Sequence, residues 1–412
     1  MTCATDAPTT VPNLWTTNFR FYFGARTTSL LGDAMLPVAL SVGVLKAGYG
    51  ATGVGYALGS WTAALALCML FGGVLADRFT ARRMMIVADL VRFVIQAGMA
   101  ALFALGQPSL LVIVALQFVS GVATALFQPG VASLVPQVSG DIQRGNGVLR
   151  VAESMAGVLG PALAGVLVTM SGPSVVFAIY SATYAISAVC LSALRLTPAT
   201  VVSDISFLGQ LAEGWQEFRA RAWLWSVITI FLFYGCFVVG MSLPIAAELV
   251  TSELGSTGLG IGMAALGLGG ALGGTVAIRV RGGRPLTLGS IGWALFAVYP
   301  LVPALHPNLV ELAVGWAVAG TGLAFWSVIW ATTVQTQIPS ELLNRVYAYD
   351  VAGSLVCMAL GRSLAGPLAS VTGERPLMVF ACVLGLTCAA LLLAVPATRR
   401  LVIPATSASN TG

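Results

Sequence analysis

Long apolar runs are the feature of this sequence that most limits its fold. There are twelve of them, each about 20 residues or longer, at residues 19–45, 52–76, 82–106, 109–134, 143–170, 174–195, 223–249, 257–280, 285–305, 308–335, 343–371 and 376–396. A helix of about 20 residues crosses the roughly 30 Å hydrocarbon core of a bilayer, and it satisfies its own backbone hydrogen bonds there. The sequence therefore predicts an all-α integral membrane protein with twelve transmembrane helices.

The composition also indicates a protein whose surface faces lipid. Apolar residues make up 58% of the chain and charged residues only 8%, against about 25% charged residues in an ordinary globular domain. So few charges cannot cover the surface of a water-soluble protein of 412 residues. We therefore expect the lipid bilayer to be the main partner of this surface.

Several functions are excluded by missing motifs. Lys46 is the one lysine and no glycine precedes it, so a nucleotide-binding P-loop is absent. His306 is the one histidine and Pro307 follows it, so an HExxH zinc site is absent. The cysteines lack CxxC spacing, and a Gly-x-Ser-x-Gly elbow is missing. We expect no enzyme, no cofactor, no metal and no nucleotide, and the net charge of +5 implies no nucleic acid.

The basic residues predict the orientation in the membrane. With the N-terminus inside, sixteen of the 20 arginines and lysines fall in cytoplasmic segments, whereas Lys46 and Arg375 fall outside. Basic residues concentrate on the cytoplasmic side of membrane proteins. We expect both termini to be cytoplasmic. The excess of arginine over lysine is typical of a GC-rich bacterial genome, which suggests a bacterial plasma (inner) membrane, and we expect a monomer.

The chain resembles itself across its midpoint. Residues 135–177 and 338–380 share a hydrophobic-Pro pair, an acidic residue and an arginine, a helix with Gly-Pro, and a final Val-Phe. Two six-helix bundles in parallel repeat are implied, with a central cavity that rocking opens to either side. The predicted parts are an N-terminal tail (1–18), the first bundle (19–195), a cytoplasmic linker (196–222), the second bundle (223–398) and a C-terminal tail (399–412). An amphipathic helix is expected in the linker, acting as a regulatory latch or as a simple tether.

Two short motifs point to a family. Residues 72–83 read GGVLADRFTARR, and residues 160–165 read GPALAG. Together with DLVR at 89–92, FQPG at 127–130 and RVYAYD at 345–350, they resemble the major facilitator superfamily, in its branch of enterobactin, macrolide and tetracycline exporters. The loop departs from the family signature at Thr80 and Ala81, and Gln117 stands where many drug–proton antiporters carry an arginine.

The resemblance implies an alternating-access transporter and assigns two groups of residues. The loop motif and the start of the eleventh span imply a cytoplasmic gate made of Gly73, Asp77, Arg78, Arg82, Arg83 and Arg345. A purely topological role for these arginines is the alternative. Gly160, Pro161 and Gly165 are similar to the antiporter motif of exporters, although Ala164 replaces one of its glycines.

Ionisable residues inside the spans are the candidates for chemistry. Each unpaired charge costs roughly 2.5–3.5 kcal/mol at mid-bilayer, so such groups must pair, face water or become neutral. Asp89 and Arg92, and likewise Arg150 and Glu153, are spaced to pair within one helix. Arg362 has no partner in its own helix.

Asp33 is the first candidate for proton coupling. A carboxylate in an apolar cavity can alternate between charged and neutral forms, which a shared proton and substrate site requires. Arg26 and Ser29 share its helix face, and the alternative for Asp33 is a structural pair with Arg26 or a polar contact at the start of the helix. Asp350 is a second candidate, with a gate ion pair to Arg345 as its alternative.

Polar and aromatic stripes predict the wall of the substrate cavity. The members are Arg26, Gln117, Ser120, Thr124, Gln128, Tyr234, Phe237, Trp326 and Trp330. Packing or lipid contact is the alternative for the aromatic ones. The leading hypothesis is a proton-coupled exporter of small amphipathic drugs or secondary metabolites. An importer or facilitator of a polar metabolite and a non-transporting membrane sensor are the alternatives.

Overall fold

The computed structural model describes residues 14–78, 80–106, 108–139, 142–196, 219, 221–279, 284–338 and 340–401. All regular elements within these ranges are helices. Six form the first bundle: α1 (Thr17–Lys46), α2 (Gly50–Arg78), α3 (Ala81–Ala104), α4 (Leu110–Val138), α5 (Ile142–Ser171) and α6 (Pro173–Ser192). The bounds lie within a few residues of the predicted spans.

The second bundle contains shorter and longer segments. They are α8 (Ala222–Phe233), the π-helix η1 (Tyr234–Gly240), α9 (Met241–Arg279), α10 (Pro285–Phe296), α11 (Val298–Ala304), α12 (Leu309–Gln337), α13 (Ser340–Thr372), α14 (Glu374–Ala394) and α15 (Pro396–Arg399). The predicted linker (196–222) lies outside the described residues, apart from positions 196, 219, 221 and 222.

Counting membrane crossings requires a closer look at one segment. Eleven described segments are long and apolar enough to span a bilayer, and one of them, Ala222–Ala277, has 56 residues. At 1.5 Å per residue it would measure about 84 Å, more than twice the hydrocarbon thickness. Gly255 interrupts it with φ 72° and ψ 177°, a conformation that glycine tolerates. The segment therefore contains two crossings, and the prediction of twelve membrane helices is confirmed.

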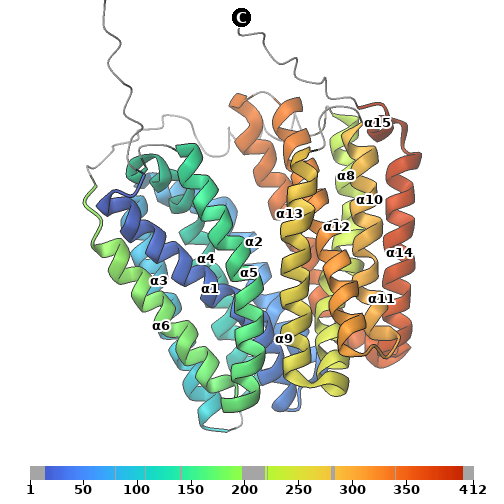
Figure 1. The fold of residues 1–412 in the computed structure, drawn as a ribbon, viewed down its shortest axis with the longest axis horizontal. Helices are drawn as coiled ribbons and strands as arrows, with labels where there is room; N and C mark the ends of the chain where they lie inside the picture. Colours follow the sequence, from blue (N-terminus) through green and yellow to red (C-terminus); the bar gives the residue numbers. More distant parts are fainter. Residues whose placement is uncertain are drawn as a thin grey trace, which may run out of the picture.

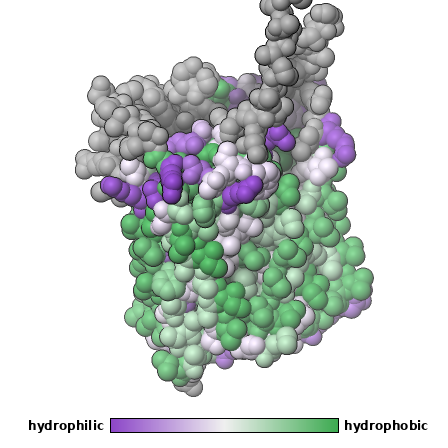
Figure 2. Space-filling view, turned by 60° about the vertical axis from the view of Figure 1, so that its left-hand side comes forward, coloured by the Kyte–Doolittle hydropathy of each residue, from purple (hydrophilic) through white to green (hydrophobic). Residues whose placement is uncertain are grey.

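The two bundles stand side by side (Figure 1). We call the end at which α1 begins and α15 lies the terminal end, and the other the opposite end. Apolar side chains cover most of the face seen in Figure 2, and hydrophilic residues gather toward the terminal end. Large apolar side chains such as Leu111, Val189 and Val94 are 77%, 69% and 63% exposed, which fits a surface solvated by lipid.

Glycines bring the bundles into direct contact toward the opposite end. A Cβ on Gly55 of α2 would lie 2.1 Å from the carbonyl oxygen of Arg362 in α13, and one on Gly165 of α5 would lie 2.9 Å from the Cα of Gly260 in α9. The hydroxyl of Thr169 lies 2.7 Å from that of Ser256 across the same α5–α9 contact. Small residues let helices approach this closely, so substitutions here would act on the interface between the bundles.

Candidate functional site

Asp33 lies in the middle of α1 and faces α6. Its Oδ1 accepts hydrogen bonds from Tyr180 Oη at 2.9 Å and from Tyr184 Oη at 2.5 Å, and the two hydroxyl oxygens are 2.7 Å apart. Gly32 permits this approach, because a Cβ there would lie 2.3 Å from Thr183 Oγ1 and 2.5 Å from the Tyr180 ring. Asp33 is partly exposed, whereas both tyrosines are buried.

The three oxygens form a triangle with three short contacts, but the two tyrosine hydroxyls supply only two hydrogens for them. An ionised carboxylate only accepts hydrogen bonds, and each tyrosine hydroxyl donates one. Three short contacts between Asp33, Tyr180 and Tyr184 therefore share two hydrogens when Asp33 is ionised. A protonated Asp33 supplies the third hydrogen. The geometry can hold the carboxyl group in either protonation state.

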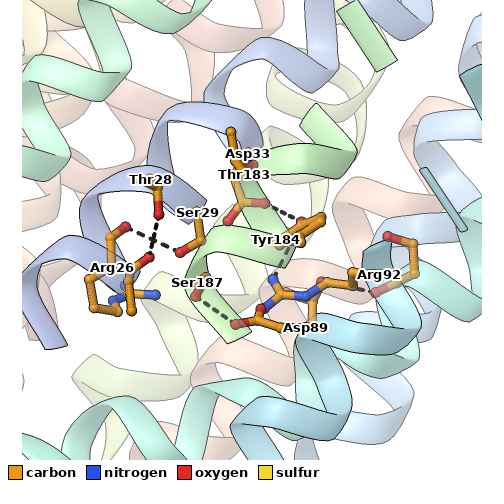
Figure 3. Close-up of polar contacts among 12 residues, drawn as sticks. Arg26, Thr28, Ser29, Asp33, Asp89, Arg92, Thr183, Tyr184 and Ser187 are labelled. Atoms are coloured by element: carbon orange, nitrogen blue, oxygen red, sulfur yellow. Dashed lines mark hydrogen bonds and ion pairs between the residues drawn. The ribbon is translucent and has the colours of Figure 1, made fainter. Parts of the chain in front are cut away.

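A buried ion pair adjoins this triangle. Arg92 of α3 pairs with Asp89 through Nη2 and Oδ1, and Ser187 Oγ donates to Asp89 Oδ2 at 2.6 Å. The guanidinium carbon of Arg92 lies 4.2 Å from the centre of the Tyr184 ring, and Arg92 Nη1 donates to Tyr184 Oη at 3.4 Å. The predicted pairing of Asp89 with Arg92 is thus present. Figure 3 shows the chain of contacts from Asp33 through Tyr184 to this pair.

The network formed by Asp33, Asp89 and Arg92 has an unbalanced negative charge when both carboxylates are ionised. Asp33, Asp89 and Arg92 sum to −1 when both carboxylates are ionised, and Asp89 and Arg92 are 0% and 1% exposed. An uncompensated charge at this depth costs roughly 2.5–3.5 kcal/mol. One proton brings the sum to zero.

Arg26 does not belong to this network. Its guanidinium carbon lies 5.4 Å from the centre of the Phe127 ring in α4, and Figure 3 shows it apart from Asp33. No ion pair joins Arg26 to Asp33 in the described part of the chain. The alternative interpretation, in which the two form a structural pair, is not what the structure shows, because Asp33 is turned toward the tyrosines of α6 instead.

The sequence analysis did not select Tyr180 and Tyr184 of α6, because it searched the spans for charged residues. Tyr180, Tyr184 and Ser187 are spaced at i, i+4 and i+7, so they lie on one helix face. This polar stripe inside an apolar span was the available signal. It says that the face is polar, but not which helix it meets.

The polar stripe predicted on α4 is mostly buried within the first bundle. Gln117, Ser120 and Thr124 are 0%, 0% and 7% exposed, and Gln128 is exposed. Ser120 Oγ accepts from Gln96 Nε2 at 3.3 Å, and both amide atoms of Gln117 lack a protein partner. Buried unpaired amides are rare, and Gln117 is one in the described chain.

The aromatic residues predicted for the cavity gather inside the second bundle. Tyr234 stacks on Trp293 with ring centres 4.2 Å apart, Trp293 meets Trp326 at 4.8 Å, and Trp326 stacks on Trp330 at 5.6 Å. Phe237 packs edge-on against Phe380 of α14 at 6.3 Å. Trp293 was absent from the prediction. It joins residues of η1 and α12 into one cluster.

The predicted gate is described only in part. The side chains of Asp77, Arg78 and Arg345 lie outside the described residues, and so does that of Asp350, the second candidate for proton coupling. The backbone is helical at these positions and at Gly73.

The two remaining gate residues have different surroundings. Arg82 donates through Nε to the carbonyl of Leu191 at 2.9 Å and through Nη2 to that of Ser192. It lies at the C-terminal end of α6, where a cation is favourable. Arg83 is exposed.

The Gly160–Gly165 segment lies where three helices meet. A Cβ on Gly160 would lie 2.6 Å from the Cβ of Ala34, the neighbour of Asp33 in α1. A Cβ on Gly260 of α9 would lie 2.7 Å from the carbonyl oxygen of Pro161 and 2.8 Å from the Cα of Gly165. This segment of α5 therefore touches both the Asp33 helix and the second bundle.

A family model described as Major Facilitator Superfamily matches residues 22–357. The chain belongs to this superfamily. It is therefore a multi-pass membrane transporter and not an enzyme. The resemblance noted in the loop and Gly-Pro motifs is confirmed at the level of the family.

Individual relatives are distant. The chain is 24% identical to the enterobactin exporter EntS of Salmonella paratyphi A over 364 residues, which cover 86% of each chain, and 24% identical to that of Citrobacter koseri over 363 residues, covering 86% and 85%. Among solved structures it is similar to the nucleoside transporter NupG, with a TM-score of 0.71 and 13% identity over 92% and 98% of the two chains.

A second similar solved structure is in an inward-facing conformation. It is a bacterial homologue of the human lysosomal transporter Spinster, in an inward-facing and unoccupied conformation, with a TM-score of 0.69 and 15% identity over 92% and 96% of the chains. At these identities the solved structures show the fold alone.

Proposed function

We propose that this chain is a proton-coupled exporter of small amphipathic molecules that works by alternating access. The observation that carries the proposal is the triangle of Asp33, Tyr180 and Tyr184, which accepts a carboxyl group in either protonation state. The direction of transport is supported by the relatives named enterobactin exporters and by the Gly160–Gly165 segment.

The coupling proton binds at Asp33. This residue is the partly exposed end of a network whose other members are buried. With the proton bound, the network is neutral and each of the three short contacts in the triangle has a hydrogen. With the proton released, the extra negative charge disfavours the packed arrangement of α1 on α6. Protonation thus changes the relative stability of two arrangements, which is the requirement for coupling.

The movement passes to the second bundle through α5. Gly160 contacts α1 next to Asp33, and Gly165 and Pro161 contact Gly260 of α9. A shift of α1 therefore changes how α5 packs on α9. Rocking of one bundle against the other opens the cavity at alternate ends.

The predicted gate and topology complete the proposal. In one state the carboxylate of Asp77 pairs with Arg345 and holds the cytoplasmic side closed, with Arg78 and Arg83 beside it, and Asp350 is a second protonation site. Both termini face the cytoplasm of a bacterium, the protein lies in the inner membrane, and a monomer is sufficient. These assignments rest on the motif and on the arginine distribution.

Inside-out vesicles with an imposed pH gradient test the proposal. We expect a panel of fluorescent lipophilic compounds to accumulate with wild-type protein, and accumulation to stop when an ionophore collapses the gradient. Asp33→Asn should abolish it while folded protein stays in the membrane. Glu153→Gln is the matched control, because its carboxylate pairs with Arg150 at 2.8 Å on the surface and is 49% exposed.

Two results would count against the proposal. Gradient-driven accumulation that survives in Asp33→Asn would remove Asp33 from the coupling mechanism. Uptake in the reverse direction in right-side-out vesicles would identify an importer instead.

A further inference from the structure

Arg362 lies where α13 packs closely against both α2 of the first bundle and η1 of the second. A Cβ on Gly55 of α2 would lie 2.1 Å from the carbonyl oxygen of Arg362, and one on Gly361 would lie 1.9 Å from that of Cys236 in η1. Arg362 is ten residues from the end of α13 at Thr372, about 15 Å along a helix, or half the hydrocarbon thickness. The guanidinium therefore belongs to a residue anchored near mid-membrane.

The partners of this guanidinium are all neutral. Arg362 Nη1 donates to the hydroxyl of Thr62 and, at 3.4 Å, to the carbonyl of Leu58, both on α2 of the other bundle. Its Nε is buried without a partner. No carboxylate contacts Arg362 among the residues that the structure describes.

Three other arginines of the described chain have carboxylate partners. Arg92, Arg150 and Arg375 each pair with an aspartate or glutamate. An intramembrane charge without a counter-charge costs roughly 2.5–3.5 kcal/mol and is a functional-site candidate by default. Arg362, near mid-membrane, has no carboxylate partner among the described residues, and an anion would supply its counter-charge.

The adjoining segment has an unusual backbone. Residues Tyr234–Gly240 form a π-helix of seven residues, and Cys236 within it is the residue that meets Gly361. π-helical turns are rare and recur at functional sites. This observation is independent of charge and marks the same place in the fold.

We propose that Arg362 binds an oxyanion group of the transported molecule. The inference rests on the proposed function and adds the substrate's charge class, an amphipathic anion. A carboxylate or similar group supplies the missing counter-charge, and the planar guanidinium offers it two parallel donors. Because Arg362 now donates to α2, an anion that draws it away from Thr62 also weakens the α2–α13 contact. Substrate binding thereby favours separation of the bundles at the opposite end.

Binding of two matched probes tests this inference. 4-Butylbenzoate and 4-butylbenzamide have nearly the same shape and differ in charge. We measure their binding to the full chain in nanodiscs by scintillation proximity, with empty nanodiscs subtracted. Wild type should bind the benzoate at least about ten-fold more tightly than the amide, as expected for a charge-assisted pair.

Variants separate a binding role from a structural one. Arg362→Gln should remove the preference, Arg362→Lys should keep part of it, and Arg150→Gln, on the exposed surface, should keep all of it. Thr62→Val keeps the side-chain volume and removes the competing acceptor, so benzoate binding should tighten. A residue that only links the bundles would leave benzoate affinity unchanged in Thr62→Val.

Clear results would overturn the inference. They are equal affinity of wild type for both probes, no binding of the benzoate by wild type, or a preference that survives in Arg362→Gln. If Arg362→Gln does not fold, the inference is also overturned by benzoate affinity that stays unchanged in both Arg362→Lys and Thr62→Val. Failure of the proposed function is distinct, since vesicles without proton-driven transport can still show the benzoate preference.

Discussion

The hydroxyl of Tyr184 lies 2.5 Å from Oδ1 of Asp33, which joins the middle of α6 to the middle of α1. This contact connects the candidate proton site to the only part of the first bundle that is both charged and fully buried among the described residues. Removing this hydroxyl therefore tests whether the network takes part in proton coupling or only stabilises the fold.

Tyr184→Phe removes the hydroxyl and keeps the ring that lies 4.2 Å from Arg92. We expect the loss of one hydrogen bond to lower the free energy of unfolding by about 0.5–1.5 kcal/mol, and we expect proton-driven transport to slow markedly. Tyr49→Phe is the control, because its hydroxyl donates to the carbonyl of Pro108 at 3.0 Å away from the network. Equal transport rates in the two variants would contradict a role for Tyr184 in coupling.

Breaking the buried Asp89–Arg92 pair should cost much more than breaking an exposed one. Arg92→Leu leaves a buried carboxylate without its counter-charge, so we expect a loss of about 3–5 kcal/mol. The double variant Asp89→Leu, Arg92→Leu should lose less than the sum of the two single changes. Arg150→Leu, in an exposed pair, should change stability by about 0–1 kcal/mol. Thermal unfolding in detergent, followed by circular dichroism, measures these differences, and additive losses would argue against a coupled pair.

The contact of Gly165 with Gly260 should control how closely the bundles approach. Gly165→Ala places a Cβ 2.9 Å from a backbone atom, so α5 and α9 must separate. A Cβ on Gly147, in the same helix, meets nothing within 4 Å. Both changes gain about 0.8–1.0 kcal/mol of helix propensity, which makes Gly147→Ala the matched control.

Thiol labelling reports this separation. Ser256→Cys, in a background without the native cysteines, places a thiol where Ser256 is 8% exposed. Gly165→Ala should raise its rate of reaction with a maleimide, and Gly147→Ala should leave the rate unchanged. Equal labelling rates would show that the glycine contact does not set the distance between the bundles.

Glu248 should stabilise the state in which the opposite end is closed. Its Oε2 accepts from the backbone N–H of Ala51, so a carboxylate of the second bundle lies at the N-terminus of α2 in the first. A negative charge at a helix N-terminus contributes about 0.3–1 kcal/mol and up to roughly 2 kcal/mol when partly buried. Glu248→Gln keeps an acceptor and removes the charge, so we expect faster labelling of Ser256→Cys.

Glu311→Gln is the control for this charge. Glu311 accepts from the backbone N–H of Asn308 at 2.9 Å at the start of α12, within one helix and one bundle. Its neutralisation should affect stability by a similar amount without changing the labelling rate. A parallel rise in both variants would mean that the charge acts on overall stability and not on opening.

The sequence alone determined the elements of this protein. Twelve membrane helices follow from the length of the apolar runs, because each helix satisfies its own backbone within the bilayer. Pairing of Asp89 with Arg92 also follows from sequence, since residues three apart share a helix face. The family follows from a loop motif whose residues are contiguous.

Tertiary structure decided which helix faces meet. Asp33 is singled out by its charge, but its partners Tyr180 and Tyr184 are about 150 residues away in the chain. Arg26 shares the helix face of Asp33 and nevertheless lies on Phe127. Arg362 reaches Thr62 across 300 residues. Helical periodicity specifies what lies on each face, whereas the packing of all helices together sets the rotation that brings two faces into contact.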